Sequence, residues 1–303
     1  MFAVVGTVPD REFPLVSGEV NLEDNVICIQ GKKVSVNRGT PALLAAAIKT
    51  CEVLDQPAPF GYLVGDIGQG DGSRRLYKYL NQNLGKCDPQ SKSGTSFNTI
   101  AFHYLQPDVD GHNRVLFAVD EMAQRPVLIA DAGFMYAAKM SGQSAKYDLF
   151  TPDVGELAFL ADEEAPHPFY TRGFILHEEN RIPELISRAY EHDNAPRYLL
   201  VKGGQDYVAD SQGIQATIDS PVEGAMEAMG GTGDTLTGIV AALIAAEIEI
   251  KEAAVIAART NRLAGSFAKP TPATQVMEIV EHIPRALEAI LYKDEGISEQ
   301  IRA

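Results

Sequence analysis

GGTGDTLTG occupies residues 230–238 and opens a strongly apolar segment that predicts a helix over residues 232–246. The three closely spaced glycines let the backbone turn tightly and point successive N–H groups outward. The amino end of the helix behind them adds about half a positive charge. Together these features predict an anion site, suited to a phosphoryl group, at Gly231, Thr232 and Gly233.

Asp234 lies at the start of this helix, directly beside the expected anion site. A carboxylate next to a bound phosphate is electrostatically unfavourable unless it has a chemical role. The role that fits is that of a general base, which takes the proton of a substrate hydroxyl as it attacks phosphorus. The structural alternative is a glycine-rich turn with Asp234 as helix N-cap, since Asp is favoured there. The pattern GxxxxGK[ST] is absent from the chain, which excludes a P-loop NTPase.

Short apolar runs rich in β-branched and aromatic residues alternate with helical patterns along the chain. This alternation predicts an α/β fold with a central, mostly parallel sheet covered by helices on both faces. We expect a single domain over residues 1–303, with ligands at the carboxyl ends of the strands. The predicted strands are residues 2–5, 26–29, 62–64, 100–105, 127–130, 198–201, 207–209 and 214–218. The predicted helices are residues 41–54, 73–84, 113–123, 154–161, 182–192, 232–246, 251–267 and 274–291.

Some local features of this pattern can be stated more closely. The most regular helical period covers residues 274–291, with Thr274 as the expected N-cap. The stretches 85–98 and 161–173 are rich in polar residues, Gly or Pro and predict irregular structure. His103 lies in a predicted strand and is expected to be a strand residue rather than a metal ligand. The histidines form no HxxxH pair and none lies near a cysteine, so we expect no zinc site.

The charge balance restricts the class of partner. Lys and Arg number 26 against 41 Asp and Glu, which gives a net charge of −15. Such an acidic protein is not expected to bind nucleic acid or an anionic membrane. A small ligand that carries phosphate is still compatible with a locally positive pocket. The expected partners are therefore a nucleotide and a small-molecule substrate, and a homo-oligomer remains open.

Cysteine usage and the amino-terminal residues predict a cytoplasmic location. Cys28, Cys51 and Cys87 are odd in number and widely spaced, so we expect unpaired thiols. The first residues lack the basic and apolar regions of a signal peptide. The longest apolar run, residues 239–246, is too short to cross a bilayer.

The order of motifs resembles the ribokinase-like superfamily and, within it, the ATP- or ADP-dependent NAD(P)H-hydrate dehydratases. The strongest likeness is that of GGTGDTLTG to the dehydratases' GGTGDxLxG. Three further segments resemble the family's TPHPGE, strand-ending KG and DAD motifs, namely TPDVGE at 151–156, VKGG at 201–204 and IADAG at 129–133. A weaker likeness joins Gly39-Thr40-Pro41 to the family's GAP segment. VGD at 64–66, followed by Gly70, resembles instead the VGDD..G of sugar kinases.

The resemblance implies a three-layer ribokinase-like sandwich that uses ATP or ADP together with Mg²⁺. In it Asp234 is the base, and Glu156 with Asp153 supports the metal. Glu156 could equally be a first-turn Glu that complements a helix dipole. Lys202 ends a strand, where it could face a phosphate or simply solubilise the surface.

The resemblance also implies which residues contact the two substrates. Gly203 and Asn261 would lie at the nucleotide, and Asn261 has a poor helix propensity that hints at a role. Gly39 and Asp131 would lie at the other substrate, with Asp131 on a substrate hydroxyl. A solvent-facing Asn261 and a merely strand-terminal Asp131 are the simpler alternatives.

Several segments depart from the dehydratase pattern. The family's GGS..Y is not visible ahead of Gly39, GPGLG is replaced by Leu105-Gln106-Pro107-Asp108, and the second Asp of DAD is Gly133. The His-Pro of TPHPGE is Asp153-Val154 here. These departures fall where the substrate pocket is expected. The leading hypothesis is nucleotide-dependent dehydration of hydrated NAD(P)H. The alternatives are a kinase of a sugar or small alcohol and, less favoured, a non-catalytic nucleotide-binding protein.

Overall fold

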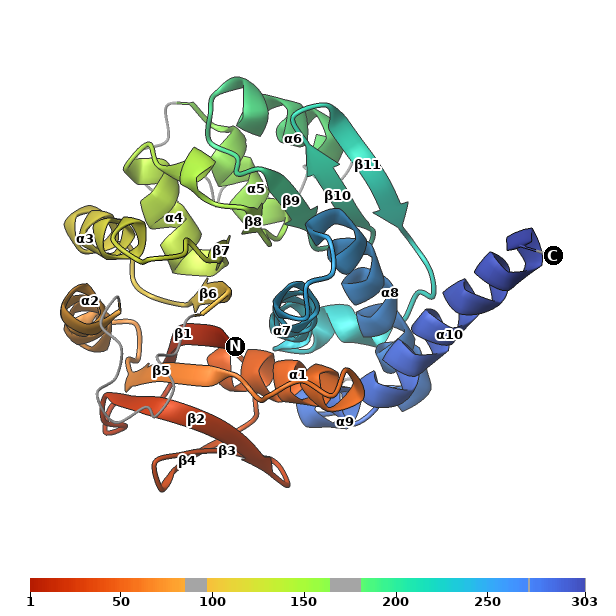
Figure 1. Ribbon diagram of the computed structural model, residues 1–303, viewed down its shortest axis with the longest axis horizontal. Helices are drawn as coiled ribbons and strands as arrows, with labels where there is room; N and C mark the ends of the chain where they lie inside the picture. Colours follow the sequence, from red (N-terminus) through yellow and green to blue (C-terminus); the bar gives the residue numbers. More distant parts are fainter. Residues whose placement is uncertain (85–96, 164–180, 272, 303) are drawn as a thin grey trace.

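The computed structural model describes residues 1–84, 97–163, 181–271 and 273–302, in which strands and helices alternate as predicted (Figure 1). The strands are β1 (Phe2–Val8), β2 (Val16–Glu23), β3 (Val26–Ile29), β4 (Lys32–Ser35), β5 (Phe60–Gly65), β6 (Thr99–His103), β7 (Val127–Ala130), β8 (Leu149–Phe150), β9 (Tyr198–Val201), β10 (Asp206–Asp210) and β11 (Gly213–Ile218). The α-helices are α1 (Thr40–Val53), α2 (Asp71–Asn83), α3 (Val109–Asp120), α4 (Ala132–Met140), α5 (Val154–Ala161), α6 (Ile182–Glu191), α7 (Thr232–Ala245), α8 (Ile250–Ala268), α9 (Val276–Val280) and α10 (Ile283–Arg302).

Within the described residues, the strands form one sheet of 11 strands in the order β11-β10-β9-β8-β7-β6-β1-β5-β2-β3-β4. The central run from β9 to β5 is parallel throughout. Antiparallel strands extend the sheet at both edges, β10 and β11 at one and β2, β3 and β4 at the other. The mostly parallel α/β sheet expected from the sequence is therefore confirmed.

Helices cover both faces of the sheet, as β1 illustrates. Every residue of β1 is buried, and successive side chains point to opposite faces. Phe2 and Val4 belong to the hydrophobic core shared with α1, α7, α8 and α9. Ala3 and Val5 belong to the second core, shared with α2 to α6. Figure 1 shows the two helical layers on opposite sides of the curved sheet.

Helices α1 and α7 approach each other very closely. A Cβ atom at Gly238 of α7 would lie 2.2 Å from the carbonyl oxygen of Leu43 in α1, so only glycine fits there. Both helices therefore begin near the same point of the molecule, at Gly39 and Gly231.

The structure corrects several expectations about individual elements. Strands β2, β4 and β8 and helix α4 were not predicted; β8 spans only two residues, and β2 and β4 lie in antiparallel hairpins whose polar residues hide the pattern. The prediction of one helix over 274–291 was wrong, because α9 ends at Val280 and α10 starts at Ile283. Pro284 in the second position of α10 has no N–H to continue a preceding helix.

Some smaller expectations also change. The N-cap of α9 is Gln275, not Thr274, whose hydroxyl accepts from the N–H of Thr271 instead. Helix α3 begins four residues earlier than predicted, capped by Asp108. The predicted irregular stretches lie largely outside the described residues. Among the described cysteines, Cys28 and Cys51 are free thiols, and Cys87 lies outside them.

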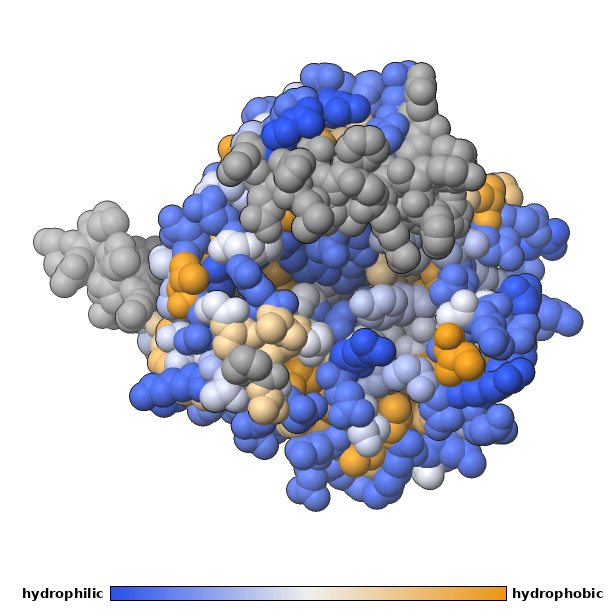
Figure 2. Space-filling view, turned by 180° about the vertical axis from the view of Figure 1, so that it is seen from behind, coloured by the Kyte–Doolittle hydropathy of each residue, from blue (hydrophilic) through white to orange (hydrophobic). Residues whose placement is uncertain are grey.

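Viewed from behind, the molecule is mainly hydrophilic and is hollowed in the middle of this face (Figure 2). None of the described helices combines the length and the apolar character needed to span a bilayer.

Candidate active site

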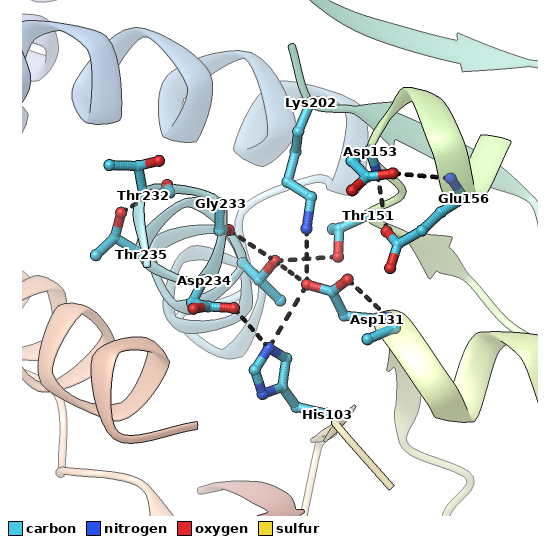
Figure 3. Close-up of polar contacts among 12 residues, drawn as sticks. His103, Asp131, Thr151, Asp153, Glu156, Lys202, Thr232, Gly233, Asp234 and Thr235 are labelled. Atoms are coloured by element: carbon cyan, nitrogen blue, oxygen red, sulfur yellow. Dashed lines mark hydrogen bonds and ion pairs between the residues drawn. The ribbon is translucent and has the colours of Figure 1, made fainter. Parts of the chain in front are cut away.

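The expected site residues converge at the carboxyl ends of the parallel strands, against the amino end of α7 (Figure 3). His103 is the last residue of β6, Asp131 follows β7 and Lys202 follows β9. Asp234 lies in the first turn of α7. The close-up shows these four side chains pointing toward one another, with Asp153 and Glu156 to one side at the start of α5.

Asp234 is held by one donor on each carboxylate oxygen. The backbone N–H of Gly39 donates to Oδ2 at 2.6 Å, and His103 Nε2 lies 3.1 Å from Oδ1. The side chain is 9% exposed, so it is sheltered but reachable. The N-cap of α7 is Gly231, with φ at 102°, which rules out Asp234 as the N-cap. Gly39, expected at the substrate, is thus shown to position the carboxylate.

His103 is the functional candidate that the sequence analysis missed. It is fully buried, and its Nδ1 lies 3.0 Å from Thr40 Oγ1. An ionised Asp234 only accepts, so His103 carries its hydrogen on Nε2, and Thr40 donates to Nδ1. Gly6 in β1 makes room for this contact, because a Cβ there would lie 2.5 Å from Thr40 Oγ1. The available signal was a histidine at the carboxyl end of an otherwise apolar strand.

The amino end of α7 has the backbone arrangement expected of an anion site, and anion binding there remains a prediction. No side chain caps this helix, so the first-turn N–H groups are free to bind an anion. Gly231 adopts a left-handed conformation that suits glycine. The hydroxyl of Thr232 turns back to donate to the carbonyl of Met226, which leaves its backbone for the anion site.

Two cations flank this helix end, although neither is near Asp234 in the sequence. A Cβ at Gly233 would lie 3.6 Å from Lys202 Nζ, so the ammonium group stands directly beside the loop. On the other side, a Cβ at Gly230 would lie 3.6 Å from Cδ of the exposed Arg38. Arg38 was not identified from the sequence. Positive charge on both sides of this helix end would favour a phosphate, and phosphate binding there remains a prediction.

Lys202 is held in place by Asp131. Its Nζ lies 2.8 Å from Asp131 Oδ2, which also accepts from Thr237 Oγ1 at 2.7 Å. Burial alone would lower the pKa of Lys202, but the charges of Asp131 and Glu156 outweigh it and raise that pKa, so the ammonium stays charged. Burial would likewise raise the pKa of Asp131, yet the charge of Lys202 and the hydrogen bonds from Lys202 and Thr237 hold that pKa below its usual value.

Asp131 has little capacity left for a substrate. Its second oxygen accepts from the N–H of Ala132 at 2.8 Å, as the N-cap of α4. The structure therefore shows Asp131 as the anchor of Lys202. Its contact with a substrate hydroxyl remains a prediction.

Asp153 and Glu156 form a capping box at the start of α5. Each side chain accepts from the other's backbone N–H at 2.8 Å, and Tyr136 donates its hydroxyl to Glu156 at 3.2 Å. Burial, followed by the charges of Asp153 and Asp131, raises the pKa of Glu156 to about 8. A cation bound beside these carboxylates would lower that pKa and favour the ionised form of Glu156.

The carboxylates fit Mg²⁺ only in company with phosphate and water. In the part of the chain that the structure describes, no three His, Cys, Asp or Glu side chains converge to bind a metal by themselves. Mg²⁺ commonly uses one or two carboxylates and keeps several waters. Asp153 and Glu156 satisfy that requirement, and their roles as metal supports remain a prediction.

Gly203 and Asn261 support the site from behind. The N–H of Gly203 donates to Asp206, and its carbonyl accepts from Arg262, which pairs with Asp206 at 2.7 Å. Asn261 Oδ1 accepts from Thr235 Oγ1 at 2.7 Å and its Nδ2 donates to the carbonyl of Thr232 at 3.0 Å. Asn261 thus joins α8 to the first turn of α7. Nucleotide contacts for both residues remain predictions.

One departure from the family pattern has a clear structural cause. A Cβ at Gly133 would lie 1.9 Å from the carbonyl oxygen of Leu105. The segment after β6 therefore occupies the space that a second Asp of the DAD motif would need. The two altered segments, Gly133 and Leu105 to Asp108, are coupled by this contact.

Comparisons with solved structures agree with this fold. The structure of an ADP/ATP-dependent NAD(P)H-hydrate dehydratase from Bacillus subtilis, co-crystallised with ATP and Mg²⁺, superposes with a TM-score of 0.54 at 15% identity, covering 95% of this chain and 89% of that one. A ribokinase-like superfamily protein from Enterococcus faecalis gives a TM-score of 0.53 at 16% identity, covering 95% and 86%. The chain therefore has a ribokinase-like fold.

The sequence comparisons then identify the family. Residues 109–285 match the family model described as NAD(P)H-hydrate dehydratase, and the chain belongs to this family of ADP- or ATP-dependent lyases. An uncharacterised protein of Methanocaldococcus jannaschii is 40% identical over 250 residues, which cover 82% of this chain and all of that relative. The family resemblance predicted from the motifs is therefore confirmed.

Proposed function

We propose that the protein uses ATP or ADP to dehydrate hydrated NAD(P)H, with Asp234 as general base. The observation that carries the proposal is a carboxylate fixed by Gly39 and His103 at the mouth of an uncapped helix end. Lys202 stands beside the same helix end as a charged phosphate ligand. A protein that only bound nucleotide would have no use for a base beside the phosphate, which argues against a non-catalytic role.

The chemistry requires two steps. The ring hydroxyl oxygen of the hydrate attacks the terminal phosphorus of the nucleotide, a new O–P bond forms, and the bond from phosphorus to the nucleotide breaks. Asp234 takes the hydroxyl proton during this transfer. The lone pair of the ring nitrogen then expels inorganic phosphate, and loss of a proton from the adjacent ring carbon restores the reduced nicotinamide. Hydrate and ATP thus yield NAD(P)H, ADP and phosphate; with ADP, AMP is released.

The protein's own groups would stabilise the transferred phosphoryl group. The first-turn N–H groups of α7 and the Lys202 ammonium lie where negative charge develops. Mg²⁺, held near Asp153 and Glu156, would neutralise phosphate charge when bound. Because both partners of Asp234 are fixed by buried or backbone groups, the base needs little reorganisation when the reaction begins.

A kinase of a sugar or small alcohol is the second candidate. It shares the first step, and the contact of Gly133 with Leu105 favours it, because this pocket differs from the dehydratase pattern. The test incubates the protein with hydrated NADH, Mg²⁺ and either nucleotide. Return of the reduced nicotinamide absorbance with an equal amount of phosphate is the expected result, and Asp234→Asn is the control. A stable phosphate ester on another alcohol without that absorbance would favour the kinase.

A further inference from the structure

Tyr104 occupies an unusual backbone position beside the candidate base. Its φ is +54°, in the left-handed region that a bulky residue rarely adopts. The hydroxyl of Thr7 donates to the Tyr104 carbonyl at 2.8 Å and holds this conformation. Tyr104 is nonetheless 47% exposed, so burial of its side chain does not offset the energy of the strained backbone. Such outliers cluster where a side chain must be aimed at a ligand.

The ring of Tyr104 contacts both groups that hold Asp234. Its centroid lies 4.3 Å from that of His103, with the rings at 79° to each other. Its edge carbons would lie 3.6 and 3.7 Å from a Cβ at Gly39. The base Asp234 is the largest influence that raises the pKa of the Tyr104 hydroxyl, followed by burial. The ring therefore borders the carboxylate, and its phenol stays protonated.

We propose that Tyr104 is the platform on which the partly saturated, nicotinamide-derived ring of the substrate packs, so that the ring hydroxyl reaches Asp234. This inference rests on the proposed function and adds the residue that selects a ring-bearing substrate. An exposed aromatic face next to a fixed base provides area at little entropic cost, and it favours a ring with an apolar face over a sugar that carries several hydroxyls. Gly39 contributes by lacking a side chain, which leaves the platform open.

Steady-state kinetics of three variants test the proposal. Tyr104→Phe keeps the ring and should leave the KM for hydrated NADH unchanged. Tyr104→Leu should raise that KM roughly threefold to tenfold, as expected for the loss of an aromatic pair, while the KM for nucleotide stays constant. Tyr104→Gly relieves the left-handed strain, so it should raise or preserve the Tm while it raises the same KM. If Tyr104 had only a structural role, Tyr104→Gly would instead lower the Tm, and the KM values for hydrate and nucleotide would not change separately.

A binding experiment gives a readout independent of turnover. The chain has no Trp, so Tyr104→Trp introduces a single fluorophore. Its emission overlaps the absorbance of reduced nicotinamide, and NADPH, the product of the reaction, should quench it on binding. The matched control is Tyr292→Trp, at an exposed position on the projecting helix α10 (Figure 1), which should not be quenched at the same concentrations.

The outcomes separate the platform from the function itself. Dehydratase activity with an unchanged hydrate KM in Tyr104→Leu, or equal quenching in both Trp variants, would overturn the platform and leave the function standing. No dehydratase activity in the wild type would refute the proposed function, and the platform with it.

Discussion

His103 Nε2 lies 3.1 Å from Asp234 Oδ1, and the two residues are 131 positions apart in the sequence. With Gly39 donating to the other oxygen, each carboxylate oxygen has one donor and one remaining lone pair. The carboxylate is therefore fixed in direction yet can still accept a proton. This arrangement makes the roles of base and positioning residue separable by mutation.

Asp234→Asn should abolish most turnover while nucleotide still binds. Loss of a general base costs roughly 10²–10⁴ in rate. Asn keeps the size of the side chain and its oxygen can accept from Gly39, and His103 can change tautomer to accept from the amide. We expect calorimetric titration with ADP to give wild-type affinity. Turnover at the wild-type rate would remove Asp234 from the mechanism.

His103 should act as a positioning residue, which a pair of variants can show. His103→Gln places an amide N–H near Asp234, whereas His103→Leu offers no donor. We expect kcat to fall roughly tenfold to a hundredfold in the Leu variant, in keeping with a hydrogen bond to a charged group, and much less in the Gln variant. KM should change little in either. Equal kcat values at matched Tm would contradict the assignment.

Gly233→Val should block the nucleotide site without unfolding the protein. A Cβ at Gly233 would meet Lys202 at an ordinary contact distance of 3.5 Å, so Gly233→Ala is a matched control that fits. The branched methyl groups of Val would enter the space between Lys202 and the first-turn N–H groups. Thermal stabilisation by ATP or ADP should vanish for Val and persist in part for Ala. Full stabilisation of the Val variant would mean that nucleotide binds elsewhere.

Glu156→Gln should raise the magnesium requirement more than the nucleotide KM. Gln preserves the capping box of α5 but removes the charge that would support the cation. The loss should be partial, because Mg²⁺ keeps several waters and phosphate ligands. Titrating Mg²⁺ at saturating nucleotide compares the two proteins. Coincident titration curves would exclude Glu156, and full activity in EDTA would exclude a metal requirement.

The same variant should change how stability depends on pH. The pKa of Glu156 is raised from 4.5 to about 8, so the folded protein binds this proton more tightly than the unfolded chain. The free energy of unfolding should therefore fall as pH rises from about 4.5 to about 8, through this group. Glu156→Gln should gain stability relative to the wild type over that range, with no further gain above it. Denaturant titrations across the range measure this, and a constant difference would contradict it.

The sequence predicted the parallel sheet and the helix end well, because both depend on local patterns. Alternating apolar runs indicate strands and helices, and the closely spaced glycines of residues 230–238 indicate a tight turn whatever the rest of the fold. The antiparallel strand β2, the edge strand β4 and the two-residue β8 were missed, because polar or very short segments carry little periodicity. Pro284 is a local signal for the break between α9 and α10, because proline has no N–H to continue the preceding helix. The regular apolar stripe across both helices hides this break.

The partners of the site residues could not be predicted in the same way. Gly39, His103 and Lys202 meet Asp234 or its helix end only because the topology places the ends of β6 and β9 beside α7. A histidine in a strand gives no local signal that its ring will reach a carboxylate 131 positions away. The strained φ of Tyr104 is likewise held by Thr7, which lies in β1 and is far from Tyr104 in the sequence. Such pairings follow from long-range packing, which cannot be predicted from local patterns in a single sequence.

The close contact of α1 and α7 at Leu43 and Gly238 determines the distance between the first turns of these helices, where Gly39 and Asp234 lie. The contact lies about one turn after Gly39 in α1 and about one turn after Asp234 in α7. A single added methyl group at Gly238 would push the helices apart at a point where backbone meets backbone. Because the helices are stiff, that displacement would lengthen the 2.6 Å hydrogen bond from the Gly39 N–H to Asp234 Oδ2. The direction of the Asp234 carboxylate, the proposed base, therefore depends on the packing of two residues inside the core.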